Sequence, residues 1–438
     1  MPSPITVPVA LVGGGMFGGD VVLRSIEDFE RCGLAPYLGR VGLDHRARAL
    51  SEVRLRLVAI GTRSAASAER LCGLYRDKLP GSTPRPYHGE KPWEDMFARE
   101  EVRILFVATP DSLHHEPTVH ALRCGAHVMV EKPLTLRLQQ ADEILGLSRE
   151  RNLVVGVDMH KRYDPCHRFI FERLISKIGK PLYARAVLEE PLEVSTETFQ
   201  WARTSNPFSY VGVHWADLFG HYLRLEPVSV HAVGQRELLV NWDREGGRAP
   251  IDTFDSMQVA VDYRSGLRVY YVNNWINPKE FEGRVNQEME IVGTRGKIEF
   301  DQQYRGLRAT IAGVGSKTFN PHFTLDVPRI EPGRVKPSCA YDGYGKDSIV
   351  VIVERALEVE LGLATRDELR GTYPDVESAR HTVAILEAAE TVAALNWRYL
   401  REGRGTPVTA RMDETGIEIV DPVGRNRRIY ARAVGAGL

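Results

Sequence analysis

A glycine pattern near the N-terminus, Gly13-x-Gly15-x-x-Gly18, has the spacing of a phosphate-binding turn. It follows a β-rich run at residues 5–12 and opens a helical run at residues 20–30. In this context the glycines allow a tight turn, the close approach of a pyrophosphate, and close packing of helix on strand. The pattern therefore predicts a dinucleotide site, although the same glycines can also form a turn that binds no ligand.

The end of the second predicted strand, residues 55–60, bears on the choice of cofactor. An acidic residue at this place hydrogen-bonds the ribose hydroxyls of NAD, whereas an Arg pairs with the 2′-phosphate of NADP. The residues here are Thr62, Arg63 and Ser64. We therefore favour NADP over NAD, with a solvated Arg63 at a helix start as the alternative.

Lys132 has the place and the chemistry of an acid–base residue. It follows a predicted strand, residues 127–130, and side chains at the carboxyl ends of parallel strands point into the crevice that binds ligands. Partial burial lowers the pKa of a lysine toward the range useful in catalysis. The alternative is a solvated loop lysine.

The elements that position these residues change character along the chain. Strands alternate with helices up to about residue 157, which predicts an α/β Rossmann domain with a doubly wound parallel sheet. Closely spaced β-rich runs and hairpin turns then predict an α+β domain with a large, open and mostly antiparallel sheet. We expect domains at residues 1–157 and 158–438. The expected strands of the two domains are residues 5–12, 55–60, 104–108, 127–130 and 153–157, and residues 182–189, 228–233, 257–263, 267–274, 288–292 and 297–300.

Two segments do not fit a compact version of this plan. Residues 31–54 lengthen the first strand-to-strand connection well beyond a usual crossover. Residues 313–345 are polar and contain Pro and Gly, which predicts a loop. Helices are expected at residues 346–361 and 375–401, after that loop.

Composition narrows the class of protein. The 438 residues include 57 Lys and Arg against 58 Asp and Glu, so the chain lacks the positive field that nucleic-acid binding needs. The five cysteines are scattered without a C-x-x-C pair, which fits a reducing cytoplasm better than a disulfide framework or structural zinc. Residues 1–19 are apolar but lack a basic segment, so we expect a buried strand, no membrane partner and a soluble protein.

Two further motifs resemble the Gfo/Idh/MocA oxidoreductase family, which includes glucose-fructose oxidoreductase and inositol dehydrogenases. Thr109-Pro110-Asp111, with His114 beyond, is similar to the family's T-P-N-x-x-H, with Asp in place of Asn. Residues 125–133, Gly-Ala-His-Val-Met-Val-Glu-Lys-Pro, are similar to its G-x-H-V-x-x-E-K-P. The resemblance covers roughly residues 5–300.

The resemblance implies that Lys132 lies beside the nicotinamide and the reacting hydroxyl. It also implies that Glu131 contacts the cofactor or orients Lys132, and that the bond before Pro133 is cis. The expected cofactor-binding residues are Gly13, Gly15, Met16, Phe17, Gly18, Thr62, Arg63, Ser64, Thr109, Pro110, His114, Glu131 and Lys132.

The segment from Tyr210 to Asp217 looks like the family's D-x-G-x-H-x-x-D, which implies that His214 exchanges the hydroxyl proton. Tyr210 replaces the family's Asp, and a phenol donates a hydrogen bond but is not an anion at neutral pH. The expected catalytic residues are therefore Lys132, His214 and Tyr210. The spacing of His214, Asp217 and His221 permits metal ligation, but we expect no metal, because an Asp one turn from a His more often orients the ring. A core histidine is the simplest interpretation of His221.

Residues 160–165 resemble the family's N-R-R-F-x-P, with His160 in place of Asn and a longer spacing from Gly156. Aromatic planes and an Arg near residue 201 suit a polyhydroxylated ring, although core packing explains at least one tryptophan equally well. The expected substrate residues are His160, Arg162, Tyr163, Trp201, Arg203, Tyr210 and Asp217.

The resemblance implies reversible hydride transfer between NADP or NAD and a secondary alcohol or ketone of a sugar, amino sugar or cyclitol. One alternative is a glycosidase, lyase or epimerase that oxidises its sugar transiently and keeps its cofactor. Another alternative is a non-catalytic relative. The presence of both Lys132 and His214 argues against it. An unpaired open sheet leaves an apolar face, so we expect a homodimer or homotetramer packed through the second domain.

Overall fold

The computed structural model describes residues 5–199, 201–242, 250–281, 285–301, 308–312, 315–318, 320, 322–329, 338–413 and 415–431. Contacts within the chain define two compact units. The first contains residues 1–135, 140–165 and 321–379, and the second contains residues 136–139, 166–320 and 380–438. Contacts thus group residues 321–379 with the N-terminal unit, although the sequence places them beyond the expected boundary at residue 157.

The first unit is built on a six-stranded parallel sheet in the order β3-β2-β1-β4-β5-β6. This order, with β1 at the reversal point, confirms the doubly wound Rossmann sheet. β3 was not expected, because only Tyr87 of its residues is buried and the strand has no apolar run. The strands are β1 (Ile5–Val12), β2 (Val53–Thr62), β3 (Arg85–His88), β4 (Ile104–Val107), β5 (His127–Val130) and β6 (Val155–Val157).

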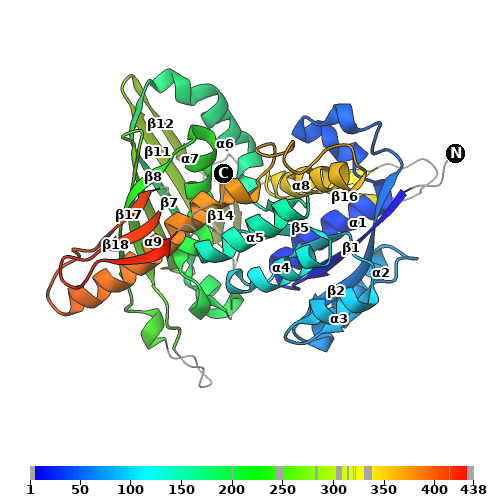
Figure 1. Ribbon diagram of the computed structural model, residues 1–438, viewed down its shortest axis with the longest axis horizontal. Helices are drawn as coiled ribbons and strands as arrows, with labels where there is room; N and C mark the ends of the chain where they lie inside the picture. The colour runs from blue at the N-terminus through cyan, green and yellow to red at the C-terminus, as the bar shows by residue number, and fades with distance from the viewer. Residues whose placement is uncertain are drawn as a thin grey trace. The chain divides into compact units, whose positions relative to one another are not determined.

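Helices of the first unit bury apolar residues against this sheet. Val9 and Leu11 of β1 share a core with Ile26 and Phe29 of the following helix. Figure 1 shows β1 and β2 beside each other, with the helices of this unit next to them. The helices are α1 (Leu23–Cys32), α2 (Ala65–Lys78), α3 (Pro92–Arg99), α4 (His115–Arg123), α5 (Leu138–Glu150) and α8 (Tyr344–Glu360).

Helix α8 packs so closely on β6 that a Cβ at Gly156 would lie 2.4 Å from Ile352. Residues 31–54 help to hold this helix. Lys346 Nζ lies 2.6 Å from the buried Asp28 carboxylate and 3.4 Å from the ring centre of Tyr37. Arg40 binds Asp347 at 3.0 Å. The long first connection therefore has a structural role in anchoring α8.

The second unit contains a nine-stranded sheet in the order β12-β11-β7-β10-β9-β8-β17-β18-β19. The expected hairpins β9–β10 and β11–β12 are confirmed, and among the described strands of this sheet only β7 and β10 pair in parallel. The strands are β7 (Pro181–Pro191), β8 (Pro227–Gln235), β9 (Ser256–Tyr263), β10 (Arg268–Asn277), β11 (Asn286–Gly293), β12 (Gly296–Asp301), β17 (Thr409–Asp413), β18 (Gly416–Val420) and β19 (Arg427–Ala431).

The expected loop at residues 313–345 was wrong for part of its length. Strands β15 (Leu325–Arg329) and β16 (Ser338–Asp342) pair there, and β13 (Arg308–Ile311) pairs with β14 (Gly315–Thr318). Backbone pairing in these two small sheets forms without the apolar alternation that sequence reading requires.

The helices of the second unit are tied to its sheet by buried polar groups. Trp215 of α7 (Val213–Leu223) donates its indole N–H to Val187 O of β7 at 2.9 Å. Asn396 of α9 (Val376–Arg401) donates to Ala232 O of β8 at 2.9 Å. A short helix, α6 (Pro165–Phe169), leads into this unit.

In the described part of the chain, no helix is both long and apolar enough to span a membrane.

Candidate active site

The glycine turn between β1 and α1 has the geometry that its sequence predicts. Gly13 has a φ of +111°, and a Cβ there would lie 2.2 Å from Ala108 O. A Cβ at Gly18 would lie 2.9 Å from Gly13 O, whereas a Cβ at Gly15 would meet nothing within 4 Å. Two glycines are therefore required by the fold, and the third leaves open space beside the backbone. This arrangement fits a dinucleotide pyrophosphate.

Thr109, which follows the end of β4, adds a hydroxyl beside this turn. Its backbone N would lie 2.8 Å from a Cβ at Gly13. Its Oγ1 is buried, and no described group forms a hydrogen bond with it. A buried hydroxyl without a partner is costly unless a ligand completes it, so Thr109 also fits a bound cofactor.

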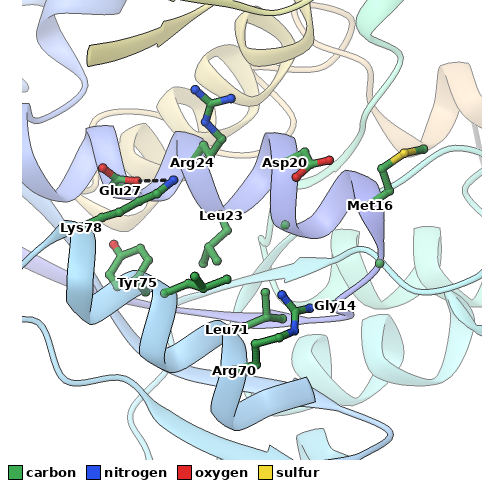
Figure 2. A pocket seen from close by; sticks show the side chains of 13 residues that line it. Gly14, Met16, Asp20, Leu23, Arg24, Glu27, Arg70, Leu71, Tyr75 and Lys78 are labelled. Carbon is green, nitrogen blue, oxygen red and sulfur yellow. Dashed lines mark ion pairs between the residues drawn. The ribbon is translucent and has the colours of Figure 1, made fainter. Parts of the chain in front are cut away.

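A pocket of about 290 Å³ begins at the glycine turn and lies between α1 and α2. Figure 2 shows that Asp20, Leu23 and Glu27, on the helical segment that follows the glycine turn, line one side of the pocket. They face Leu71 and Lys78 of α2. Lys78 lies 3.7 Å from Glu27 across it. The expected cofactor residues Gly15 and Met16 line it, but no residue of the Lys132 segment does.

The segment that follows β2 is organised by local capping. Thr62 donates its hydroxyl to Ser64 O at 2.8 Å, and Ser64 Oγ accepts the Ser67 N–H at the start of α2. Ser64 therefore caps a helix, as its residue type favours. The Arg63 side chain is 86% exposed and lies 3.3 Å from Glu90, which is 82% exposed. Such an exposed pair contributes little, so Arg63 can exchange Glu90 for a phosphate.

The Lys132 segment continues directly from β5. The Lys132–Pro133 peptide bond is cis, as expected. His114 Nδ1 lies 2.7 Å from Pro133 O, and His114 Nε2 lies 2.9 Å from Thr109 O. Burial lowers the pKa of His114 to about 4, so the ring is neutral and donates one of these bonds at a time. His114 thus holds the loops after β4 and β5 together.

Glu131 and Asp158 are buried carboxyl groups beside Lys132. Glu131 is 6% exposed and Asp158 is fully buried. Burial and the neighbouring Asp158 raise the pKa of Glu131 well above its usual value. Sequence reasoning missed Asp158, although the long spacing between Gly156 and His160 was a signal that an extra residue enters the site there.

His160 is enclosed by aromatic rings of the first unit. Its ring stacks on Phe17 of the glycine turn at 5.7 Å and on Tyr344 of α8 at 5.9 Å. Burial lowers its pKa. Arg162 is also buried and donates to Ser378 Oγ at 3.1 Å, and Tyr163 packs against the core. Their expected contacts with substrate remain predictions.

The expected residues of α7 differ in burial. His214 and Asp217 are buried in the second unit. His221 is exposed beside the Tyr222 ring at 4.8 Å, so the expectation of a core histidine was wrong. The described residues contain no group of three His, Cys, Asp or Glu side chains arranged to hold a metal ion.

Tyr210 belongs to an aromatic group in the second unit. Its ring lies 4.9 Å from Phe199, 5.5 Å from Trp201 and 6.3 Å from Trp275. Tyr210 and Trp201 are half-buried, and Arg203 is exposed. This unit thus brings two of the expected substrate residues together. Trp215, in contrast, is the tryptophan explained by core packing.

Models of two domains of one family match the chain. Residues 7–159 match the model described as "Oxidoreductase family, NAD-binding Rossmann fold", and residues 175–299 match the "GFO/IDH/MocA C-terminal domain". The fold and the glycine turn agree with these matches. The chain belongs to the Gfo/Idh/MocA family of oxidoreductases.

Two of the relatives are named as enzymes of a cyclitol and of a sugar. A scyllo-inositol 2-dehydrogenase (NAD(+)) of Bacillus subtilis (strain 168) is 23% identical over 77% of this chain and 93% of its own length. A 1,5-anhydro-D-fructose reductase of Ensifer adhaerens is 36% identical, but the match spans only 21% of this chain and 28% of the reductase.

Solved structures share the fold. GenD2 from gentamicin A biosynthesis, in complex with NAD, has a TM-score of 0.63 at 20% identity and covers 94% of this chain and 98% of its own. KijD10, a 3-ketoreductase from Actinomadura kijaniata with NADP, has a TM-score of 0.56 at 18% identity and covers 88% of this chain and 97% of its own.

Proposed function

We propose that the protein interconverts a secondary alcohol and a ketone of a sugar, amino sugar or cyclitol, with NADP or NAD as the hydride carrier. The main support is the glycine turn, which is open at Gly15 and lies beside Thr109. His114 contacts both Thr109 and the Lys132 loop. Bound nicotinamide supplies or accepts the hydride. The named sugar and inositol enzymes among the relatives support the substrate class.

Individual residues have separate roles in this reaction. Gly13, Gly15 and Thr109 hold the cofactor, with Phe17 and Pro110 in the same two loops. Lys132 holds a proton near the reacting oxygen, and a cation there stabilises negative charge on that oxygen. In the second unit His214 exchanges a proton with substrate, while the half-buried Tyr210 donates a hydrogen bond to a sugar oxygen.

We favour NADP over NAD because the chain places Arg63, rather than an acidic residue, after β2. Relatives with each cofactor are known, since the GenD2 structure contains NAD and the KijD10 structure contains NADP. The exposed side chain of Arg63 is available to a 2′-phosphate. Its only described ionic partner is the exposed Glu90.

We propose a net redox reaction rather than transient oxidation by a glycosidase, lyase or epimerase, because the relatives described above are named as dehydrogenase and reductase.

We also propose a homodimer or homotetramer. Tyr183 and Tyr270 are exposed on neighbouring strands of the nine-stranded sheet, which supports packing through that sheet. The scattered cysteines support a cytoplasmic location.

The test is the absorbance of reduced nicotinamide with purified protein, NADP and NAD in turn, and a panel of hexoses, amino sugars and inositols. Steady multiple turnovers with one substrate class, faster with NADP, are expected. Cofactor found on denaturation of the purified protein, together with no net oxidation of any substrate, would contradict the proposal and favour the retained-cofactor alternative.

A further inference from the structure

Two buried carboxyl groups lie at corresponding places on adjacent strands. In the β5–β6 pair, Val130 is the register partner of Val157. Glu131 and Asp158 are the residues that directly follow these two strands, so both lie at the carboxyl edge of the sheet. The backbone N–H of Asp158 donates to Val130 O at 2.8 Å and fixes this register. The fold therefore forces the two side chains together.

The hydrogen bonding of this pair is incomplete if both groups are ionised. Among the described residues, no group donates a hydrogen bond to Glu131 Oε1 or to either carboxylate oxygen of Asp158. Two carboxylates in contact inside a protein repel strongly, and the repulsion is relieved when they share one proton. The shared O–H also supplies the missing donor. The pair then has one proton and one negative charge.

The charged and titratable neighbours fit that state. The positive charge of Lys132 acts on Glu131, and it also acts on the neutral rings of His114 and His160. His160 Nδ1 lies 3.7 Å from Asp158 Oδ2. Two further groups face the cluster: Lys161, whose charge acts on His160, and Tyr341, which the charge of Asp158 reaches. Lys132 is therefore the cation next to the protonated pair.

We propose that Glu131 and Asp158 share one proton and act as a proton store for Lys132. The inference rests on the proposed function. It assigns to Lys132 the proton transfer that the proposed function gives to His214. In ketone reduction the carbonyl carbon gains a hydride and its oxygen takes a proton from Lys132 Nζ, which leaves a neutral amine. Glu131 then returns a proton to Lys132 Nζ, and the pair recovers one proton from solvent. Alcohol oxidation follows the reverse course.

The first test needs no turnover. Infrared difference spectra of the cofactor-free protein against Glu131→Gln are expected to show a protonated-carboxyl band at neutral pH. In Asp158→Asn the like charge is gone and the amide donates to Glu131, so the band should disappear at a lower pH than in the wild type. A wild type without the band, or an unchanged midpoint in Asp158→Asn, would overturn the shared proton.

The second test separates a proton store from a merely structural pair. Glu131→Gln and Asp158→Asn should each slow ketone reduction roughly tenfold and increase its solvent isotope effect, and Asp158→Asn should leave the Kd for NADPH unchanged. Glu143→Gln, which alters a surface carboxylate paired with His115, is the matched control. Wild-type kcat and isotope effect in both variants would overturn the store. If no substrate is turned over, the proposed function fails, and the infrared result still decides whether the proton is shared.

Discussion

His114 and Pro133 are joined by a contact of 2.7 Å between the imidazole Nδ1 and the backbone carbonyl oxygen. Because Pro133 follows Lys132 directly, this contact fixes the loop that presents the lysine. The other ring nitrogen faces Thr109 O at 2.9 Å. One buried histidine thus contacts the backbone of Thr109, at the glycine turn, and of the residue that follows the lysine that we place at the reacting oxygen.

The burial of His114 predicts a pH dependence of folding stability. Its pKa is about 4 in the folded protein and 6.5 for an ordinary histidine. At pH values between these two pKa values the unfolded chain binds more protons than the folded chain. The free energy of unfolding should therefore increase as the pH rises through this range and decrease as the pH falls. His114→Gln should flatten this slope in urea unfolding. His115→Gln, at the adjacent position, is expected to keep it; equal slopes in wild type and His114→Gln would contradict the assignment.

The three glycines of the turn should respond differently to alanine. Gly13→Ala places a Cβ 2.2 Å from Ala108 O at a positive φ, so it should destabilise the fold by at least about 2 kcal/mol. Gly15→Ala meets no protein atom, so stability should be unchanged while the Kd for NADP rises roughly tenfold. Thermal unfolding and cofactor titration measure both effects. Gly39→Ala, in equally open space, serves as the control.

Arg63→Ala tests the choice of cofactor. Loss of the guanidinium should weaken NADP binding roughly tenfold and leave NAD binding unchanged, because only NADP has the 2′-phosphate. Glu90→Gln removes the competing carboxylate, so it should strengthen NADP binding slightly. Fluorescence titration with each cofactor distinguishes these results. An equal loss for both cofactors in Arg63→Ala would refute the preference.

The buried ion pair between Lys346 and Asp28 should be important for stability. Lys346→Met leaves Asp28 buried without its cation and should cost about 3 kcal/mol or more in urea unfolding. Adding Asp28→Asn should recover part of that loss. Arg268→Met breaks an exposed pair with Asp262 and should cost less than about 1 kcal/mol. Similar losses for the two single variants would argue against the anchoring role of Lys346.

Local patterns predicted much of the fold. The bounds of β1 and β5 agree with the expected runs, because short apolar strands between turn residues leave few alternatives. The glycine turn and the cis bond before Pro133 were likewise predictable. The role of residues 31–54 was not, because it depends on contacts with α8, more than 300 positions away in the case of Arg40 and Asp347.

The sequence could predict candidate site residues that belong to a recognisable local motif. It could not predict a residue whose place in the site depends on the pairing of neighbouring strands. Asp158 became apparent only when β5 and β6 were paired, since residues 27 positions apart contact each other through the sheet. A core histidine, the simplest interpretation of His221, was wrong because helix spacing fixes the face of a helix but not what covers that face. Ser64 caps α2, and its expected contact with the cofactor stays a prediction.

The most direct measurement is a single-turnover experiment with Lys132→Met and the best substrate of the panel. Reduction of bound cofactor is followed by absorbance, and the Kd for the cofactor is measured by titration. We expect hydride transfer to slow by at least about a hundredfold while the cofactor still binds, because the lysine acts on the reacting oxygen. Wild-type rates of cofactor reduction in Lys132→Met would contradict the account.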